Sequence, residues 1–257
     1  MARRGLPSAQ KDAGSSVSTL SHRPRAKNET MPETRSYSLP YARTQRASYG
    51  AILSQTMFLV AVAIGFLVVG SYVGAGPGDA EALGRGAAMG CTIAAVVLLF
   101  AQAFIGSLRT GGAGMAVLFV VALLLGLGLG PVLESFNVTG QADVVTKAAG
   151  TTGLVVVAAG AGGTLIAKDL SGWMKPISII LLVAVAVSWG MLIFGGGGGV
   201  AGDVVSLVIG AVSAVAIVIY FNFLRLQATE DDVVWLATGI FVAVVNIFMT
   251  MLNIFGD

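Results

Sequence analysis

The sequence predicts an all-α membrane protein with seven transmembrane helices. Of its 257 residues, 56% are hydrophobic and only 11% are charged, and the mean hydropathy is +0.86. A soluble domain carries about 25% charged residues, so this chain has too little polar surface to face water on all sides. Its apolar residues form seven continuous runs rather than alternating with polar ones, which excludes a transmembrane β-barrel.

The N-terminal segment differs in composition from the rest. Residues 1–49 are rich in Ser, Arg, Pro and Thr, show no apolar periodicity and hold nine of the fifteen Lys and Arg residues. Such a segment cannot bury enough apolar surface to offset the entropy lost on ordering. We therefore predict a disordered basic cytoplasmic tail over 1–49 and a transmembrane domain over 50–257.

Each apolar run is long enough for one membrane crossing. The runs contain 18 to 23 residues, and a helix rises about 1.5 Å per residue across a hydrocarbon core about 30 Å thick. Glycine-rich connections separate several of them, including five consecutive glycines at 195–199. The predicted spans are 51–73, 86–105, 114–133, 148–167, 177–194, 204–224 and 233–254.

Lys and Arg residues predict the orientation, since they concentrate on the cytoplasmic side of membrane proteins. With the N-terminus inside, nine of them in the tail and four in connections lie on the inner side, and two lie outside. This asymmetry favours a multi-pass protein of the cell membrane with a cytoplasmic N-terminus and an external C-terminus. The four inner residues are Arg109, Lys168, Lys175 and Arg225, and the outer ones are Arg85 and Lys147.

Rare residue types argue against several chemistries. Cys91 is the only cysteine and His22 the only histidine, and His22 lies in the polar tail. A cysteine or histidine metal site, a haem with two His ligands and a Ser-His-Asp triad therefore cannot be assembled within the spans. We expect no enzyme activity, no catalytic residue, no metal, no cofactor and no nucleic-acid partner.

The last span carries a stripe of neutral polar side chains. Asn246, Thr250 and Asn253 are spaced by four and three residues, which places them on one helical face with Gly239 and Ala243. Lipid offers such side chains no hydrogen-bond partner, so the stripe should face the bundle interior. Two interpretations stay open: hydrogen bonds between helices, each worth about 0.6 kcal/mol, or the lining of a water-filled path.

Three consecutive acidic residues, 230–232, precede the last span. Negative charge at a helix N-terminus interacts favourably with the helix dipole, and this is the simpler interpretation. A calcium site there would need oxygen ligands from other segments.

Several motifs together resemble the Bax inhibitor-1 family of seven-span membrane proteins, over about residues 43–257. The most specific are Ala-Gly-Thr-Thr at 149–152 and Ala-Lys-Asp-Leu-Ser-Gly at 167–172, in the fourth span and the loop after it. The glycine-rich sequence that ends in Pro131 and the closing segments of the last two spans are also similar to the family.

The resemblance implies six helices around a central C-terminal helix, and a cation (calcium) leak regulated by pH. In the family, this regulation depends on two aspartates, whose positions fall on Asn222 and Ala243 here. Neither residue titrates in the physiological range. The resemblance thus predicts a calcium or other cation leak, or a small-solute pathway, with altered pH gating. The alternative is a membrane interaction protein that modulates other membrane proteins such as quality-control proteases.

The predicted orientation can be tested by reporter fusions. Alkaline phosphatase, which is active only after export, should be active when fused after Asp257, and a cytoplasmic reporter should be inactive there. As a control, phosphatase fused after Arg109, in a predicted inner connection, should be inactive. A C-terminal reporter that works only inside would contradict the count of seven spans.

Overall fold

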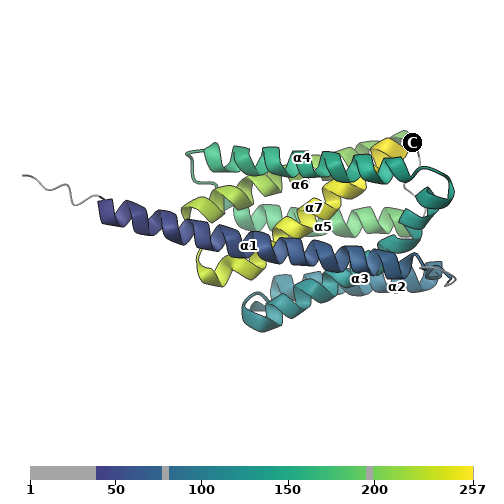
Figure 1. Ribbon diagram of the computed structural model, residues 1–257, viewed down its shortest axis with the longest axis horizontal. Coiled ribbons are helices and arrows are strands. Elements are labelled where there is room, and N and C mark those ends of the chain that lie inside the picture. The colour runs from purple at the N-terminus through teal and green to yellow at the C-terminus, as the bar shows by residue number, and fades with distance from the viewer. Residues whose placement is uncertain (1–38, 77–80, 195–198, 257) are drawn as a thin grey trace, which may run out of the picture. The chain divides into compact units, whose positions relative to one another are not determined.

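The computed structural model describes residues 39–76, 81–194 and 199–256, and its regular elements in these ranges are all helical (Figure 1). The predicted all-α membrane fold class is therefore confirmed. Three single 3₁₀ turns, at Gly106–Leu108, Ser171–Trp173 and Glu230–Asp232, lie in connections. The α-helices are α1 Leu39–Gly74, α2 Arg85–Phe104, α3 Gly111–Val138, α4 Ala142–Leu165, α5 Met174–Phe194, α6 Val200–Leu226 and α7 Val233–Gly256.

Every predicted run coincides with one of these helices. Within the described ranges, six helices are long and apolar enough to cross a membrane by length and composition. The remaining helix, α5, has 21 residues. The apolar segment counted there over described residues, Ser171–Val187, begins in the preceding 3₁₀ turn and is shorter than the other six. The chain is therefore a multi-pass membrane protein whose outward-facing helices contact the lipid bilayer.

Several helix ends differ from the predicted run ends, most clearly in α1, α3 and α4. Helix α1 begins at Leu39, before the predicted end of the tail at residue 49, and the first 38 residues of that tail lie outside the described residues. Helix α4 begins at Ala142 and ends at Leu165, whereas its apolar run spans 148–167. Backbone hydrogen bonding can extend a helix beyond its apolar part wherever the side chains remain solvated.

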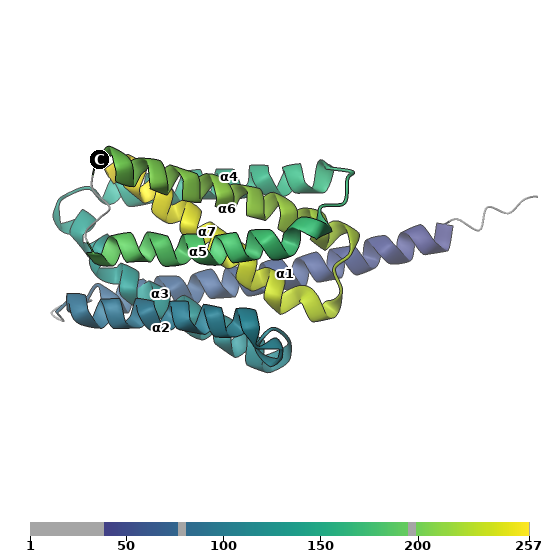
Figure 2. The same ribbon diagram turned by 180° about the vertical axis from the view of Figure 1, so that it is seen from behind.

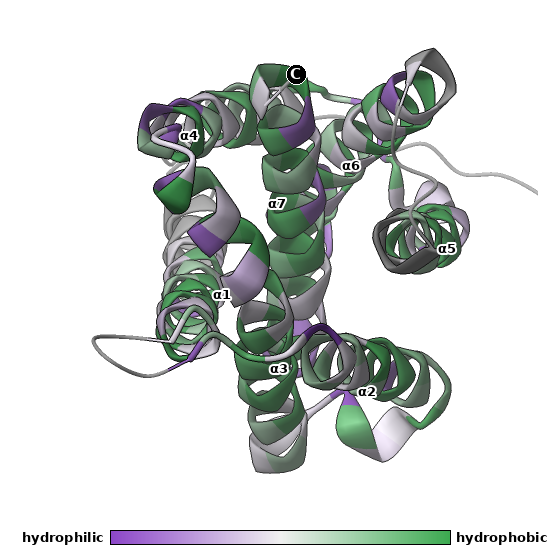
Figure 3. Ribbon diagram, turned by 90° about the vertical axis from the view of Figure 1, so that its right-hand side faces the viewer, coloured by the Kyte–Doolittle hydropathy of each residue, from purple (hydrophilic) through white to green (hydrophobic). Residues whose placement is uncertain are grey.

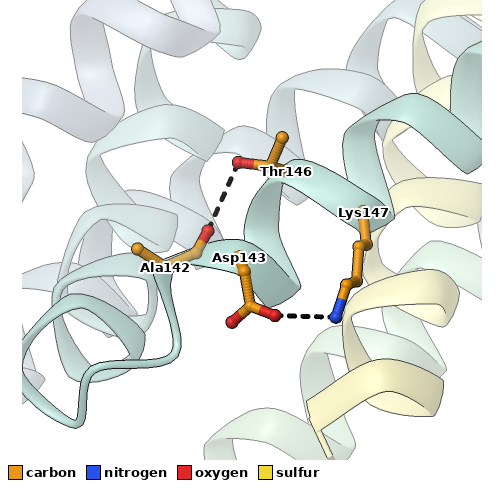
Figure 4. A network of polar contacts seen from close by, with 4 residues as sticks. All are labelled: Ala142, Asp143, Thr146 and Lys147. Atoms are coloured by element: carbon orange, nitrogen blue, oxygen red, sulfur yellow. Dashed lines mark hydrogen bonds and ion pairs between the residues drawn. The ribbon is translucent and has the colours of Figure 1, made fainter.

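The first turn of α4 shows how a polar helix start is stabilised (Figure 4). Lys147 Nζ lies 2.7 Å from Asp143 Oδ2, and Thr146 Oγ1 donates to the Ala142 carbonyl at 3.3 Å. Asp143 also lies in the first turn, where its charge interacts favourably with the helix dipole. Both charged side chains are more than half exposed, so water screens the pair and it adds little to stability.

Helix α7 is the inner helix of the bundle. In its most apolar 18-residue window, 72% of residues are buried, against 22–44% for the other five candidate spans. It packs against α3, α4, α5 and α6. Seen along the bundle, α7 lies between α1 and α4 on one side and α5 and α6 on the other (Figure 3). It also runs obliquely to its neighbours (Figure 2). A central C-terminal helix, as the family resemblance implied, is therefore present.

The acidic turn before α7 forms a capping box. Asp232 Oδ2 accepts hydrogen bonds from the Thr229 backbone N–H at 3.0 Å and from the Thr229 hydroxyl at 2.8 Å. This arrangement satisfies backbone donors at the helix start and supports the dipole interpretation of the acidic residues.

Small residues let α1 and α3 approach until their backbones touch. A Cβ built on Gly126 would overlap the Leu67 carbonyl oxygen, and one built on Gly70 would overlap the Leu123 carbonyl oxygen. Gly130 meets the backbone of Gly74 in the same way. Close packing through small residues is a main source of helix association in membranes. Lipid tails are as apolar as the helix surfaces, so the hydrophobic effect does not drive helices together there.

Adding one methyl group at this contact should separate the two helices. We expect Gly126→Ala to lower the free energy of unfolding by about 1–3 kcal/mol, as for other overpacked cores. The matched control is Gly90→Ala in α2, where a Cβ meets nothing within 4 Å. That change should be neutral or stabilising, because Ala is the better helix former. Thermal unfolding of both variants in detergent gives the comparison, and equal midpoints would contradict the close packing.

Candidate functional site

The polar stripe of α7 faces α6. The Thr250 hydroxyl lies 2.9 Å from the Ser206 carbonyl oxygen of α6, and Asn253 Nδ2 donates to Asp203 Oδ1 at 3.2 Å. A Cβ on Gly210 would lie 2.7 Å from Thr250 Cγ2, so the two backbones are close here. At Thr250 and Asn253 the stripe therefore forms hydrogen bonds between helices, the first of the two interpretations.

Asn246 behaves differently from the other two members of the stripe. It is 1% exposed, and its Nδ2 has no hydrogen-bond partner within the described parts of the chain. An unmet buried donor costs about 1–3 kcal/mol. Because its packing among the described residues provides no partner for this donor, Asn246 stays a candidate lining residue.

A small pocket of about 60 Å³ opens between α2, α5, α6 and α7. All four helices contribute from the end that carries the α4–α5 and α6–α7 connections, the end predicted to be cytoplasmic. Most of the wall is apolar, with four polar side chains among it. The lining residues are Leu99, Gln102, Ala103, Ser178, Leu181, Leu182, Tyr220, Trp235, Thr238, Gly239 and Val242.

Hydrogen bonds join the polar side chains of the pocket in two pairs. Gln102 Nε2 of α2 donates to Thr238 Oγ1 of α7 at 3.2 Å. The Ser178 hydroxyl of α5 lies 3.2 Å from the Tyr220 hydroxyl of α6. Gly239 makes room for the phenol, because a Cβ there would lie 2.7 Å from Tyr220 Cζ. These pairs hold four helices together around the pocket.

Sequence reasoning did not identify these four polar residues. Each is an isolated polar side chain in an otherwise apolar run, and no spacing rule connects residues on four different helices. The only available signal was Gln102 itself, an amide near the end of the second span, because lipid provides no partner for it.

The structure gives Asn222 a clear structural role. Its side chain is completely buried, Oδ1 accepts from the Leu170 backbone N–H at 3.0 Å, and Nδ2 donates to the Ile166 and Lys168 carbonyls at 2.9 and 3.1 Å. Arg225, one turn later on α6, donates to the same Ile166 carbonyl at 2.7 Å. Asn222 thereby binds the α4–α5 connection to α6 and satisfies carbonyls at the end of α4.

The two positions matched to the family's aspartates do not lie opposite each other. The contacts Ser206–Thr250 and Tyr220–Gly239 define an antiparallel register in which Ala243 faces residues near 215. Asn222 lies about seven residues farther along α6, which is roughly 10 Å of helix. Ala243 is fully buried. Sequence matching suggested a pair, and the register separates its members.

Two comparisons with known proteins bear on this arrangement. The model of a protein family described as "Inhibitor of apoptosis-promoting Bax1" matches residues 44–257. A comparison with curated proteins finds no match. The matched residues cover all seven helices from within α1 to the C-terminus.

Removing the Asn222 amide should release the α4–α5 connection. We expect Asn222→Ala to lower the free energy of unfolding by about 2–4 kcal/mol, because the Leu170 N–H and two carbonyls lose their partner in a buried setting. Asn137→Ala, at an exposed position at the end of α3, is the control and should change stability little. The measurement is the thermal midpoint in detergent. Similar midpoints for the two variants would show that the hydrogen bonds of Asn222 to the α4–α5 connection are dispensable.

Proposed function

Because the chain belongs to the Bax inhibitor-1 family, we propose that it forms a leak pathway for small cations or other small solutes along the interface of α6 and α7. The observation that carries the proposal is the continuity of one α7 face. Thr238, Val242 and Asn246 follow each other at spacings of four, so the pocket and the predicted stripe share this face. Polar groups then continue through Thr250 to Asn253 at the other end.

We place a closed point in the middle of this line of polar groups. Val242, which is 5% exposed, lines the pocket and lies about one helical turn before Asn246. An apolar constriction of this kind blocks ions because they cannot shed their hydration shell there. The arrangement supports a pathway that is closed in this conformation and opens when α7 moves relative to α6.

Beyond Asp203 at its outer end, the pathway we propose lacks the charges that calcium would favour. Between Asp203 and Glu230, and again from Val233 to Gly256, the sequence contains no Asp, Glu or His. A divalent ion normally requires carboxylate or multiple carbonyl ligands. We therefore propose that transport by this chain is not selective for calcium and that the family's aspartate-based gate does not operate. The N-terminus would face the cytoplasm, as the Lys and Arg distribution favours.

Among the described residues, Asp203 at the outer end is the one acid whose contacts place it on this interface, and this scarcity of acids also favours the alternative function. A Bax inhibitor-1 fold without a working gate can act as a membrane interaction protein that modulates other membrane proteins, such as quality-control proteases. The two functions differ in one measurable property, because only the leak moves solutes in purified vesicles.

Val242→Ala should increase the leak, because the smaller side chain widens the apolar constriction. Purified protein in liposomes would be assayed with entrapped dyes for calcium and for monovalent cations. We expect at least a severalfold higher flux for Val242→Ala than for the natural protein. Val244→Ala, two residues away and off the pathway face, should behave like the natural protein. If neither protein conducts any tested solute, the interaction function is favoured.

The same assay provides the pH dependence. Flux should vary little between about pH 5 and 8, because α6 and α7 contain no side chain that ordinarily titrates in that range. A steep response would locate the sensor elsewhere, and Asp203, which binds Asn253, would be the first residue to replace.

A further inference from the structure

The pocket contains a buried acceptor that protein atoms leave unmet. Gln102 is 2% exposed and lines the pocket, and its Oε1 has no hydrogen-bond partner in the part of the chain that the structure describes. Its other amide atom is bound to Thr238. A carbonyl oxygen of this kind offers two lone pairs to anything that enters the pocket.

The hydroxyl protons around the pocket are already committed to other acceptors. Thr238 Oγ1 donates to the Val234 carbonyl at 2.9 Å, so towards Gln102 it can only accept, which defines the orientation of the amide. Ser178 Oγ donates to the Met174 carbonyl at 2.7 Å, so the Tyr220 hydroxyl must donate to Ser178. The polar wall of the pocket therefore offers free lone pairs and no free hydroxyl donor.

This polarity determines which kind of molecule fits. An anion without a proton cannot donate a hydrogen bond to Gln102 Oε1. A cation would meet no carboxylate, and the Arg109 guanidinium lies close by, donating to the backbone carbonyl of Gln102 at 3.2 Å and to the backbone carbonyl of Ala103. Burying a charge without a counter-charge is strongly unfavourable. A small uncharged hydrogen-bond donor meets neither objection, and the cavity volume of about 60 Å³ has room for molecules of the size of water.

We propose that the pocket is a binding site for a small uncharged hydrogen-bond donor, of the size of water or ammonia, which donates to Gln102 Oε1 and Tyr220 Oη. The pocket's role as the inner binding site of a solute pathway rests on the function proposed above, and the proposal names the solute class. Its ability to bind such a molecule rests only on the pocket geometry.

A stability measurement tests occupancy. In a Thr238→Val background, Gln102 has lost its protein partner, so the bound donor is the main remaining partner of the amide. Adding Gln102→Leu should then lower the thermal midpoint by a few degrees if the donor is bound. The matched control is Thr56→Val in α1, which removes another buried oxygen without a partner among the described residues, away from the pocket. It should leave the midpoint unchanged or raise it. If Gln102→Leu also leaves the midpoint unchanged or raises it, the proposal is overturned.

Trp235 reports which donor binds, because it lines the pocket. In a Trp173→Phe, Trp189→Phe variant it is the only tryptophan. Ammonium chloride would be titrated at an alkaline pH where much of it is uncharged, with tetramethylammonium chloride at equal concentration as a control that has no N–H group. A saturable emission change with ammonium alone, abolished by Gln102→Leu, identifies ammonia. A Gln102-dependent midpoint without such a change identifies water, and equal changes with both salts contradict donor recognition.

These measurements are independent of transport. If both succeed while liposomes show no flux of any solute, the pathway fails and the binding site stands. If flux is present and the midpoint test fails, the pathway stands and the pocket is not its binding site.

Discussion

Lipid supplies no hydrogen-bond partner, so a polar side chain in this bundle must turn toward the protein interior. This constraint accounts for the position of α7. A helix with Asn246, Thr250 and Asn253 on one face cannot present that face to hydrocarbon, so it occupies the centre, where 72% of its most apolar window is buried. The outer helices present apolar side chains outward and meet α7 with their inner faces.

The same constraint explains the polar contacts at the end of the bundle predicted to be cytoplasmic. The α4–α5 connection contains backbone groups that no helix satisfies, and Asn222 supplies both a donor and an acceptor to them. Arg109 in turn binds carbonyls at the end of α2, and Asp232 binds the Thr229 N–H before α7. One side chain at each connection therefore satisfies the backbone where the helices end.

Within the interior, polarity without charge defines what the protein can do. A titratable pair would couple conformation to pH, since two nearby carboxylates share a proton. The neutral groups of α2, α5, α6 and α7 instead form hydrogen bonds that carry no charge. Gln102 and Tyr220 offer acceptors at one end of the α7 face, and Asn246 offers an unmet donor beyond Val242. This order of acceptor, apolar constriction and donor suits uncharged or weakly selected solutes better than a divalent ion.

The sequence by itself determined the fold class, the seven helices and the inward direction of the α7 stripe. These follow from hydropathy and from helical periodicity, which are local properties of the chain. Only the tertiary structure decided which residues meet. Gln102, Ser178, Tyr220 and Thr238 come from four helices, and helix rotation and register bring them together around one pocket. Register also separates Asn222 from Ala243, which sequence matching had paired, because a shift of about seven residues along antiparallel helices amounts to roughly 10 Å.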